Sequence, residues 1–172
     1  MKTFKELLIE LNACKDAREW AGDKSWEEIY NTCHRGDWLL WLFKRTNPDD
    51  LQLLTLAKGR CANTVRHLMK DKRSIKAVDA AIAFGEGKIS KEELDAAASA
   101  ASDGAAYAAV SAAADDAAYA AYDAAAGGTY AAVGAAYAAY AAASSDDAKK
   151  ENQQLTADIC RKYLPIEVWN IK

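Results

Sequence analysis

The chain has 172 residues and a formal net charge of −3, which is the size of one ordinary soluble domain. Alanine is in large excess, with 39 residues in all and 28 of them between Ala96 and Ala143, whereas both prolines lie outside that stretch. This composition excludes a β-sandwich, a collagen-like rod, a disulfide-rich secreted module and a typical disordered tail. The chain is therefore predicted to be all-α, a compact multi-helix bundle with close-packed Ala-rich central helices.

Start and stop signals divide the chain into ten predicted helices. These cover residues 3–12, 13–21, 26–35, 38–46, 48–69, 74–84, 91–102, 104–126, 129–144 and 147–163. The pattern Ser/Thr-x-x-Glu, in which hydroxyl and carboxylate each accept a hydrogen bond from a backbone N–H, begins at Thr3, Ser25 and Ser90. Asp37 and Asn47 are further N-cap candidates. The glycines expected to end helices are Gly22, Gly36, Gly85 and Gly127-Gly128.

These helices are assigned to one domain with three parts, namely a tryptophan-rich half at 1–90, Ala/Tyr-rich helices at 91–145 and a closing helix at 146–164. Four of the five tryptophans lie in the first part, between Trp20 and Trp41. We expect them to build the core of that half around the run 38–43, because an element that is apolar on all sides belongs in a core. The alternative is that Trp20, Trp26 or Trp38 is a hot spot for a binding partner.

The predicted helix 48–69 carries an apolar stripe at helical spacing. Its members are Leu51, Leu54, Ala57, Cys61, Val65 and Leu68. Arg60 and His67 face away from the stripe, so this helix is predicted to face the core. Cys61 lies on the stripe, and its thiol is expected to pack there as a small apolar group.

The Ala-rich helices have a packing pattern of their own. Tyr130, Val133, Tyr137 and Tyr140 share one stripe of the predicted helix 129–144, and its other faces are almost entirely alanine. Alanine helices can approach to the short end of the usual axis separation, about 8 Å, which predicts a close-packed central hairpin with the tyrosines filling one seam. If one chain cannot bury both the stripe and its alanine back, a homodimer through this helix follows.

Charge is unevenly distributed along the chain. Residues 92–148 contain nine acids and no Lys or Arg, whereas the remainder carries a net charge of +6. This layout favours a protein partner with a basic surface and argues against direct nucleic-acid binding. The alternative is that the nine acids only keep an Ala-rich surface in solution.

Five residues within this acidic part are the candidate partner-binding site: Asp115, Asp116, Tyr119, Tyr122 and Asp123. Tyrosine brings amphipathic contact area at a low cost in conformational entropy, and neighbouring carboxylates can pair with Arg or Lys of a partner. The alternative is that Tyr119 and Tyr122 pack under the N-terminal helices while the aspartates are solvated.

No pattern of a catalytic or metal site is found. The four cysteines are far apart, and none belongs to a Cys-x-x-Cys pair, which favours reduced thiols in a cytoplasmic protein. His34 and His67 lack metal-ligand spacing, and there is no phosphate-binding loop, dinucleotide-binding glycine motif or zinc-protease motif. We therefore expect no enzyme activity, no metal and no cofactor.

The uncharged stretch 124–145 is long enough to raise the question of a membrane span. It contains three tyrosines, three glycines and a single valine, but no Leu, Ile or Phe. Because these strongly apolar side chains drive insertion, no membrane span is predicted.

Several blocks of the sequence resemble a known family. They are Ala17-x-x-Trp20, Cys33-x-x-Gly36-Asp37-Trp38-x-x-Trp41-Leu42, Asp71-x-Arg73, Ala77-x-x-Ala80-Ala81, a Gly-Glu-Gly break, a Glu-Glu-Leu helix entry, the Ala/Tyr tract and a closing Leu-Pro. In this order they resemble the all-helical, Ala-rich immunity proteins of bacterial polymorphic toxin systems, a family that is also common in phage genomes.

The resemblance implies a cytoplasmic protein that neutralises a toxin by stoichiometric binding and has no catalytic residues. An alternative is a phage anti-defence protein, either an inhibitor of a CRISPR or signalling effector or a sponge for a nucleotide signal. A sponge should show a cavity lined by arginines and aromatics, for which Arg60, Arg66 and Arg73 are available. An ice-binding or purely structural role is disfavoured, because the Ala-rich tract has no regularly spaced threonines.

Overall fold

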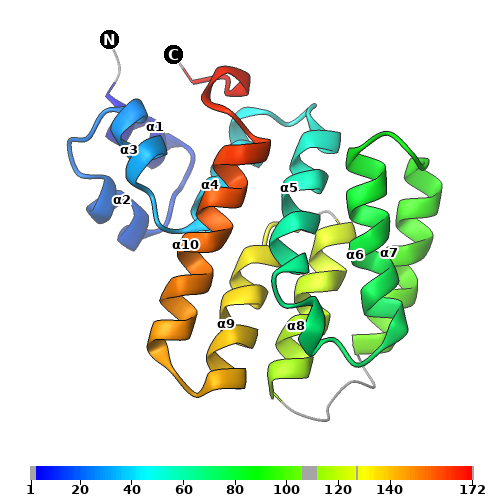
Figure 1. Cartoon of the computed structure of the whole chain (residues 1–172). Coiled ribbons are helices and arrows are strands. Elements are labelled where there is room, and N and C mark those ends of the chain that lie inside the picture. The colour runs from blue at the N-terminus through cyan, green and yellow to red at the C-terminus, as the bar shows by residue number, and fades with distance from the viewer. Residues whose placement is uncertain (1–2, 106–111, 127, 172) are drawn as a thin grey trace.

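Figure 1 shows the computed structural model of the chain, which describes residues 3–105, 112–126 and 128–171, and the side chains of these residues except 103–105 and 112–115. All regular structure in this part of the chain is helical, so the prediction of an all-α bundle is confirmed. The α-helices are α1 (Phe4–Glu10), α2 (Lys15–Ala21), α3 (Trp26–Thr32), α4 (Gly36–Thr46), α5 (Leu51–Asn63), α6 (Lys72–Gly85), α7 (Lys91–Ala105), α8 (Ala112–Ala125), α9 (Ala131–Ala143) and α10 (Asp146–Tyr163). Two 3₁₀-helices, η1 and η2, cover Arg66–Leu68 and Ile166–Val168.

The long helices pack side by side around α8 and α9, which run antiparallel as a hairpin (Figure 1). Helices α5, α6 and α7 lie on one side of this hairpin, and α10 and α4 lie on the other. The short helices α1–α3 form a separate group beside α4 and α10, at the end of the molecule where both termini lie. We call this group the N-terminal layer, residues 3–32.

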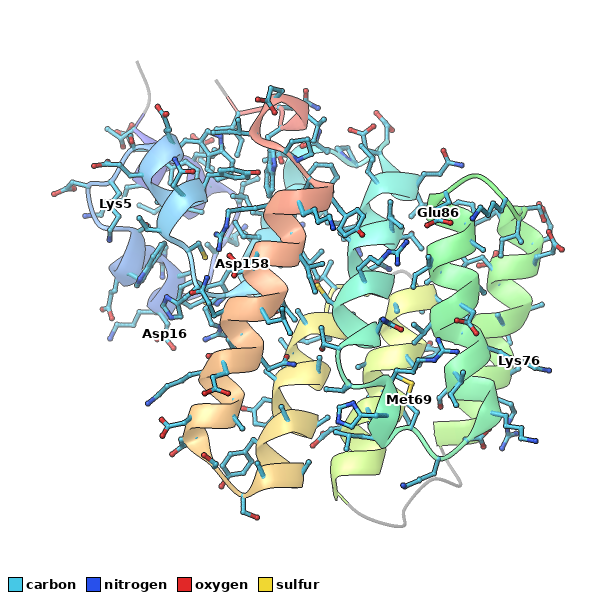
Figure 2. All side chains as sticks on the ribbon, in the orientation of Figure 1. Lys5, Asp16, Met69, Lys76, Glu86 and Asp158 are labelled. Carbon is cyan, nitrogen blue, oxygen red and sulfur yellow. The ribbon has the colours of Figure 1, made fainter. Side chains whose placement is uncertain are left out.

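Charged side chains are spread over the outside of these elements, with the exception of α9, which has none. Figure 2 shows Lys5 and Asp16 on the N-terminal layer and Lys76 on α6, all of them exposed. No helix in the described part of the chain combines the length and the apolar character that a membrane span needs.

Local capping signals are confirmed. Thr3 and Ser25 form reciprocal capping boxes at the starts of α1 and α3. The pair Ser90 and Glu93 exchanges the same two hydrogen bonds before α7, at 2.8 and 3.3 Å. Gly22 follows α2 with a φ of +54°, a conformation that costs glycine little. These ends are predictable because every partner lies within four residues along the chain.

The predicted helix 48–69 is wrong at both ends. The Asn47 side chain is buried and donates its amide to the Val168 carbonyl oxygen at 2.7 Å, so it does not cap a helix, and α5 begins only after Asp50. At the other end α5 stops at Asn63, and the short helix η1 replaces the last predicted turns. A contact more than 100 residues away along the chain thus overrides a local signal.

The start of α4 and the end of α7 also differ from the prediction. Gly36 is the first residue of α4 and not a helix stop. Asp37 lies in the first turn and not at the predicted N-cap position, and its carboxylate pairs with Arg35. Helix α7 continues to Ala105, three residues beyond its predicted end. Within the predicted helix 104–126, residues 106–111 lie outside the described residues.

Buried side chains form two clusters of different composition. The first, which we call the aromatic core, joins the N-terminal layer, α4, α10 and the C-terminal segment. Trp26 contacts Phe4 and Trp169 with ring centroids 5.5 and 4.8 Å apart, and Trp169 also meets Phe43 at 4.9 Å. Trp20, Trp38 and Trp41 also pack against this core, and Leu39, Leu40, Leu42 and Phe43 are buried in it, so the expectation that the tryptophans and the run 38–43 build this half is confirmed.

The second cluster, which we call the alanine core, lies among α6, α7, α8 and α9. Most of its members are alanines, and the larger ones are Val65, Met69, Val78, Phe84 and Leu94. Because the side chains are short, the helix backbones themselves come close together. A Cβ added to Gly134 of α9 would lie only 3.0 Å from the Ala120 backbone nitrogen of α8, which bears out the predicted close-packed hairpin.

The tyrosine stripe of α9 does not fill a seam of this hairpin, so that part of the prediction is wrong. Tyr130, Tyr137 and Tyr140 are 69%, 46% and 42% exposed. The alanines on the opposite side of α9 are buried instead, because only they allow α8 to approach so closely. The tyrosines are left on the outside.

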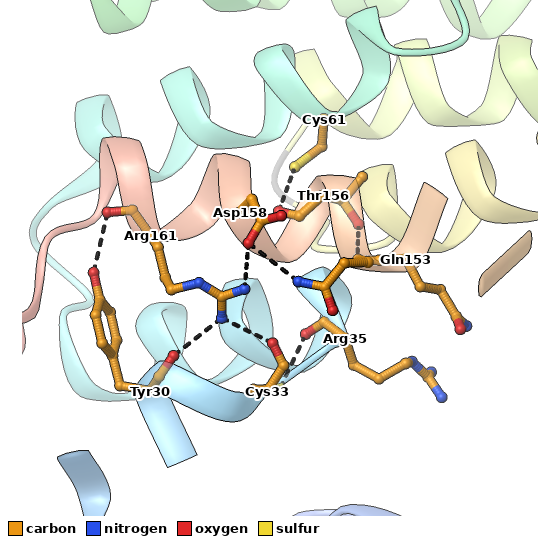
Figure 3. A network of polar contacts seen from close by, with 9 residues as sticks. Tyr30, Cys33, Arg35, Cys61, Gln153, Thr156, Asp158 and Arg161 are labelled. Carbon is orange, nitrogen blue, oxygen red and sulfur yellow. Dashed lines mark hydrogen bonds and ion pairs between the residues drawn. The ribbon is translucent and has the colours of Figure 1, made fainter. Parts of the chain in front are cut away.

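Arg161 attaches the N-terminal layer to α10, as Figure 3 shows. Its Nη1 donates to the carbonyl oxygens of Tyr30 and Cys33 at 3.0 and 2.8 Å, at the end of α3. The Tyr30 hydroxyl donates in return to the carbonyl oxygens of Arg161 and Leu164 at 3.0 and 3.2 Å. A cation at a helix C-terminus satisfies carbonyls that have no partner within the helix, so this contact both caps α3 and fixes the layer.

Candidate functional site

A cavity of about 440 Å³ lies between the N-terminal layer, α4 and the start of α9. Most of its wall is apolar, and the side chains that give it chemical character are Trp20, Arg35, Asp37, Trp38, Trp41 and Tyr130. We call this the aromatic cavity. Its volume is within the usual range of small-molecule sites, about 300–1,000 Å³.

Three tryptophans of the cavity wall each have a cation over the ring. Trp20 and Trp38 lie with their ring centroids 5.8 Å apart. The Lys24 ammonium is 4.6 Å from the Trp20 centroid, and the Arg35 guanidinium is 4.6 Å from the Trp38 centroid. Arg45 has the same relation to Trp41 at 5.6 Å. Such contacts hold both the ring and the cation in place.

Arg35 and Asp37 form a two-pronged ion pair in the cavity wall. Arg35 Nε donates to Asp37 Oδ1 at 2.7 Å, and Nη2 donates to Oδ2 at 2.6 Å. This hydrogen bonding raises the pKa of Arg35, so its guanidinium stays protonated. The paired geometry fixes the guanidinium plane, and the Nη1 edge has no protein partner among the described residues.

Two of the four free cysteines also line the cavity. Cys14 is exposed, whereas Cys33 is buried and donates its thiol to the Arg35 carbonyl oxygen at 3.5 Å. Burial raises the pKa of the Cys33 thiol to about 11, so it is protonated at neutral pH.

An exposed aromatic face extends from the cavity along α9. Its residues are Tyr130, Val133, Tyr137 and Tyr140, and we call it the tyrosine face. Tyr130 and Val133 also line the cavity, so the two surfaces are continuous. Lys149 of α10 lies 4.1 Å from the Tyr137 ring centroid.

Of the five predicted partner-binding residues, the four whose side chains are described differ in exposure. The side chain of Asp115 lies outside those described. Of the other four, Tyr119 is 55% exposed, whereas Asp116, Tyr122 and Asp123 are half-buried. Asp116 has an interaction partner, and Tyr122 packs against the alanine core. Tyr119 is therefore the one open side chain among these four.

Asp123 faces inward and organises the start of α9. Its carboxylate accepts the Tyr130 backbone N–H at 3.0 Å, which fixes the first residue of the tyrosine face. Burial raises the pKa of Asp123, and the nearby Lys58 opposes that effect. Asp123 thus positions Tyr130, a relation across seven residues that sequence spacing did not indicate.

Lys58 is completely buried behind this turn. Its ammonium donates to the carbonyl oxygen of Asp123 at 3.1 Å and to that of Ala126, at the C-terminal end of α8. Burial lowers the pKa of Lys58 to about 8. A sequence signal did exist, because Lys58 is four residues after Leu54 and three before Cys61, on the apolar stripe of α5.

The three arginines considered for a nucleotide sponge do not meet at a common site. Arg60 pairs with Glu86, Arg66 with Asp79 and Arg73 with Asp71. None of the three arginines lines the aromatic cavity, whose arginine is Arg35.

No cluster of metal-binding side chains is found among the described residues. His34 is exposed and lies edge-on to the Trp20 ring, with centroids 5.8 Å apart.

Comparison of the chain with family models, with curated proteins and with solved structures finds no match. Its function therefore has to be inferred from its own geometry.

Proposed function

We propose that this chain is a non-enzymatic inhibitor that acts by stoichiometric binding to another protein, as an immunity protein neutralises a toxin. The observation that carries the proposal is the tyrosine face, three tyrosines that are 42–69% exposed on a helix without a single charged residue. Exposed tyrosines grouped on a rigid helix are typical of binding hot spots rather than of a solvated surface.

The chemistry of tyrosine suits this role. Its ring contributes apolar contact area, its hydroxyl remains available for hydrogen bonding, and few rotatable bonds are frozen on binding. The buried alanines on the other side of α9 hold the helix against α8, so the face is presented on a rigid support. Binding then needs little rearrangement of the inhibitor.

The distribution of charge along the chain favours a partner with a basic surface. Residues 92–148, which include α8 and α9, carry nine acids and no Lys or Arg. We propose that Asp115 and Asp116, with the exposed Tyr119, extend the contact on the neighbouring helix α8. Association would then be faster and tighter at low salt, because exposed charges are screened as ionic strength rises.

The four free cysteines suit a protein that works in the reducing cytoplasm, and we include that location in the proposal.

The test pairs the purified chain with the product of the neighbouring gene in its native genome, by biolayer interferometry over a salt series. We expect a one-to-one complex that abolishes the partner's toxic activity. Tyr130→Ala and Tyr137→Ala should each weaken binding about tenfold or more. Leu51→Ala, which removes a 37% exposed apolar side chain from α5, is the control and should leave binding unchanged.

Two outcomes would overturn this proposal. One is a complex whose dissociation constant responds neither to the tyrosine variants nor to Asp115→Lys. The other is a homodimer in light scattering that Tyr137→Glu converts to a monomer, because a second copy of the chain would then occupy the tyrosine face.

A further inference from the structure

The aromatic cavity is a built site of a different kind from the tyrosine face. Its walls come from the N-terminal layer, from α4 and from the turn before α9, so it encloses a small volume rather than presenting a flat surface. What could occupy it is decided by the few polar groups in an otherwise apolar wall.

The polar group best placed to bind a ligand is the guanidinium of Arg35. Two hydrogen bonds to Asp37 and the contact with the Trp38 ring hold it in one orientation. Its Nη1 edge has no protein partner among the described residues. A guanidinium fixed in this way loses little entropy when it donates to a further acceptor.

The charged groups of the cavity wall favour a ligand that carries a hydrogen-bond acceptor. Asp37 carries the one carboxylate among the described lining residues, and Arg35 engages both of its oxygens. Lys24 and Arg45 lie over Trp20 and Trp41 without belonging to that pair. Within the lining the charges of Arg35 and Asp37 balance, so the Nη1 donors of Arg35, rather than a net charge, favour an acceptor such as a carboxylate, and the rest of the wall is mostly apolar.

We propose that the aromatic cavity binds a small organic anion, an aromatic or similarly apolar body that carries one carboxylate. The body lies against Trp20, Trp38 and Trp41, and the carboxylate accepts hydrogen bonds from the Nη1 edge of Arg35. This proposal does not rest on the proposed protein-binding function, because Arg35 and the tryptophans lie outside the tyrosine face, although Tyr130 and Val133 belong to both surfaces.

The test uses three ligands with one ring system and different charge: 1-naphthylacetate, 1-naphthylacetamide and 1-naphthylmethylamine. Isothermal titration calorimetry with the full chain should show the acid binding about tenfold more tightly than the amide, and the amine most weakly. In two-dimensional NMR the indole N–H signals of Trp20, Trp38 and Trp41 should shift. That of Trp169 should not, because it is buried and donates to the Leu164 carbonyl oxygen at 2.9 Å.

Variants assign the effect to Arg35. The double variant Arg35→Gln with Asp37→Asn removes the guanidinium without leaving an unpaired carboxylate, and it should bring acid and amide to within about threefold of each other. Arg66→Gln is the matched control, because Arg66 makes a similar two-pronged pair with Asp79 away from the cavity. It should leave the preference for the acid intact.

A third variant tests whether the ligands bind inside the cavity rather than elsewhere on the surface. Ala17 lines the cavity on α2, and Ala17→Phe should fill the space and abolish binding of all three ligands. The proposal is overturned if the wild-type chain binds the amide as tightly as the acid or binds none of the three. It is also overturned if Ala17→Phe leaves binding of the acid unchanged.

Discussion

The aromatic core and the alanine core meet at α9, which contributes Ala132 to the first and Ala131, Ala135 and Ala138 to the second. In the aromatic core, large rings and leucines fill the space between short helices and loops. In the alanine core, backbone approaches backbone and little side chain lies between. The aromatic core leaves a cavity of about 440 Å³ at its edge. In the alanine core the helices are so close that, at Gly134, even an added Cβ would crowd the neighbouring backbone.

The two cores should therefore respond differently to substitution. Stability of the aromatic core comes from the large apolar area of its side chains, so it should be damaged by removing atoms. Stability of the alanine core comes from close fit, so it should be damaged by adding atoms. Three experiments test this division.

The largest effect is expected in the aromatic core. Phe43 is completely buried and contacts Trp169, so Phe43→Ala should lower the free energy of unfolding by about 4 kcal/mol. Urea denaturation measures it. Ala138→Gly, which removes the one side-chain carbon from a buried site of the alanine core, should cost only about 1 kcal/mol. Similar losses for the two variants would contradict the proposed division.

Substitutions that add atoms should cost more stability in the alanine core than beside the aromatic core. Ala135→Leu places three extra carbons in the alanine core and should cost about 3 kcal/mol. Ala17→Leu adds the same atoms at the wall of the aromatic cavity, where space is available, and should change stability by less than about 1 kcal/mol. Thermal and urea denaturation of both variants test this pair. A severe loss at Ala17 would mean that the cavity cannot accept a side chain.

The smallest effect concerns the buried charge between the two cores. The pKa of Lys58 falls from 10.5 to about 8 on folding, so between these values the unfolded chain binds more protons and stability rises with pH. From pH 8 to pH 9 this amounts to about 1 kcal/mol.

The raised pKa of Cys33 acts in the opposite direction as pH rises through 9. We therefore compare wild type with Lys58→Met, because the contribution of the thiol is common to both and cancels. The stability of wild type relative to the variant should increase by about 1 kcal/mol over that interval. A difference that is independent of pH would show that Lys58 keeps its ordinary pKa in the folded chain.

Prediction from sequence succeeded where partners are close along the chain. The capping boxes at Thr3 and Ser25 and the glycine end at Gly22 each involve residues at most four positions apart. It failed at Asn47, whose side chain is held by Val168. It also failed for the tyrosines of α9, because periodicity identifies a face but not which neighbour covers it.

The candidate site shows the same limit. Trp20 and Trp38 were expected to build the core, with a binding role as the alternative, and the structure packs both against the aromatic core with part of each ring in the cavity wall. Arg35 was missed because its importance arises from the pairing with Asp37 and from rings contributed by three separate segments. Asp123 was predicted to bind a partner, but its side chain faces inward. Its carboxylate accepts a hydrogen bond from the backbone N–H of Tyr130, seven residues later.

The contacts of Arg161 and Trp169 have a consequence for the order in which the protein assembles during synthesis. Helices α1–α3 leave the ribosome first, yet Tyr30 finds its hydrogen-bond partners 131 and 134 residues later. The α8–α9 hairpin, by contrast, closes between neighbours and needs only a short loop. The tryptophans of the first forty residues therefore emerge long before the segment that packs against them, and a nascent chain exposes these apolar side chains until residues 161–169 have been synthesised.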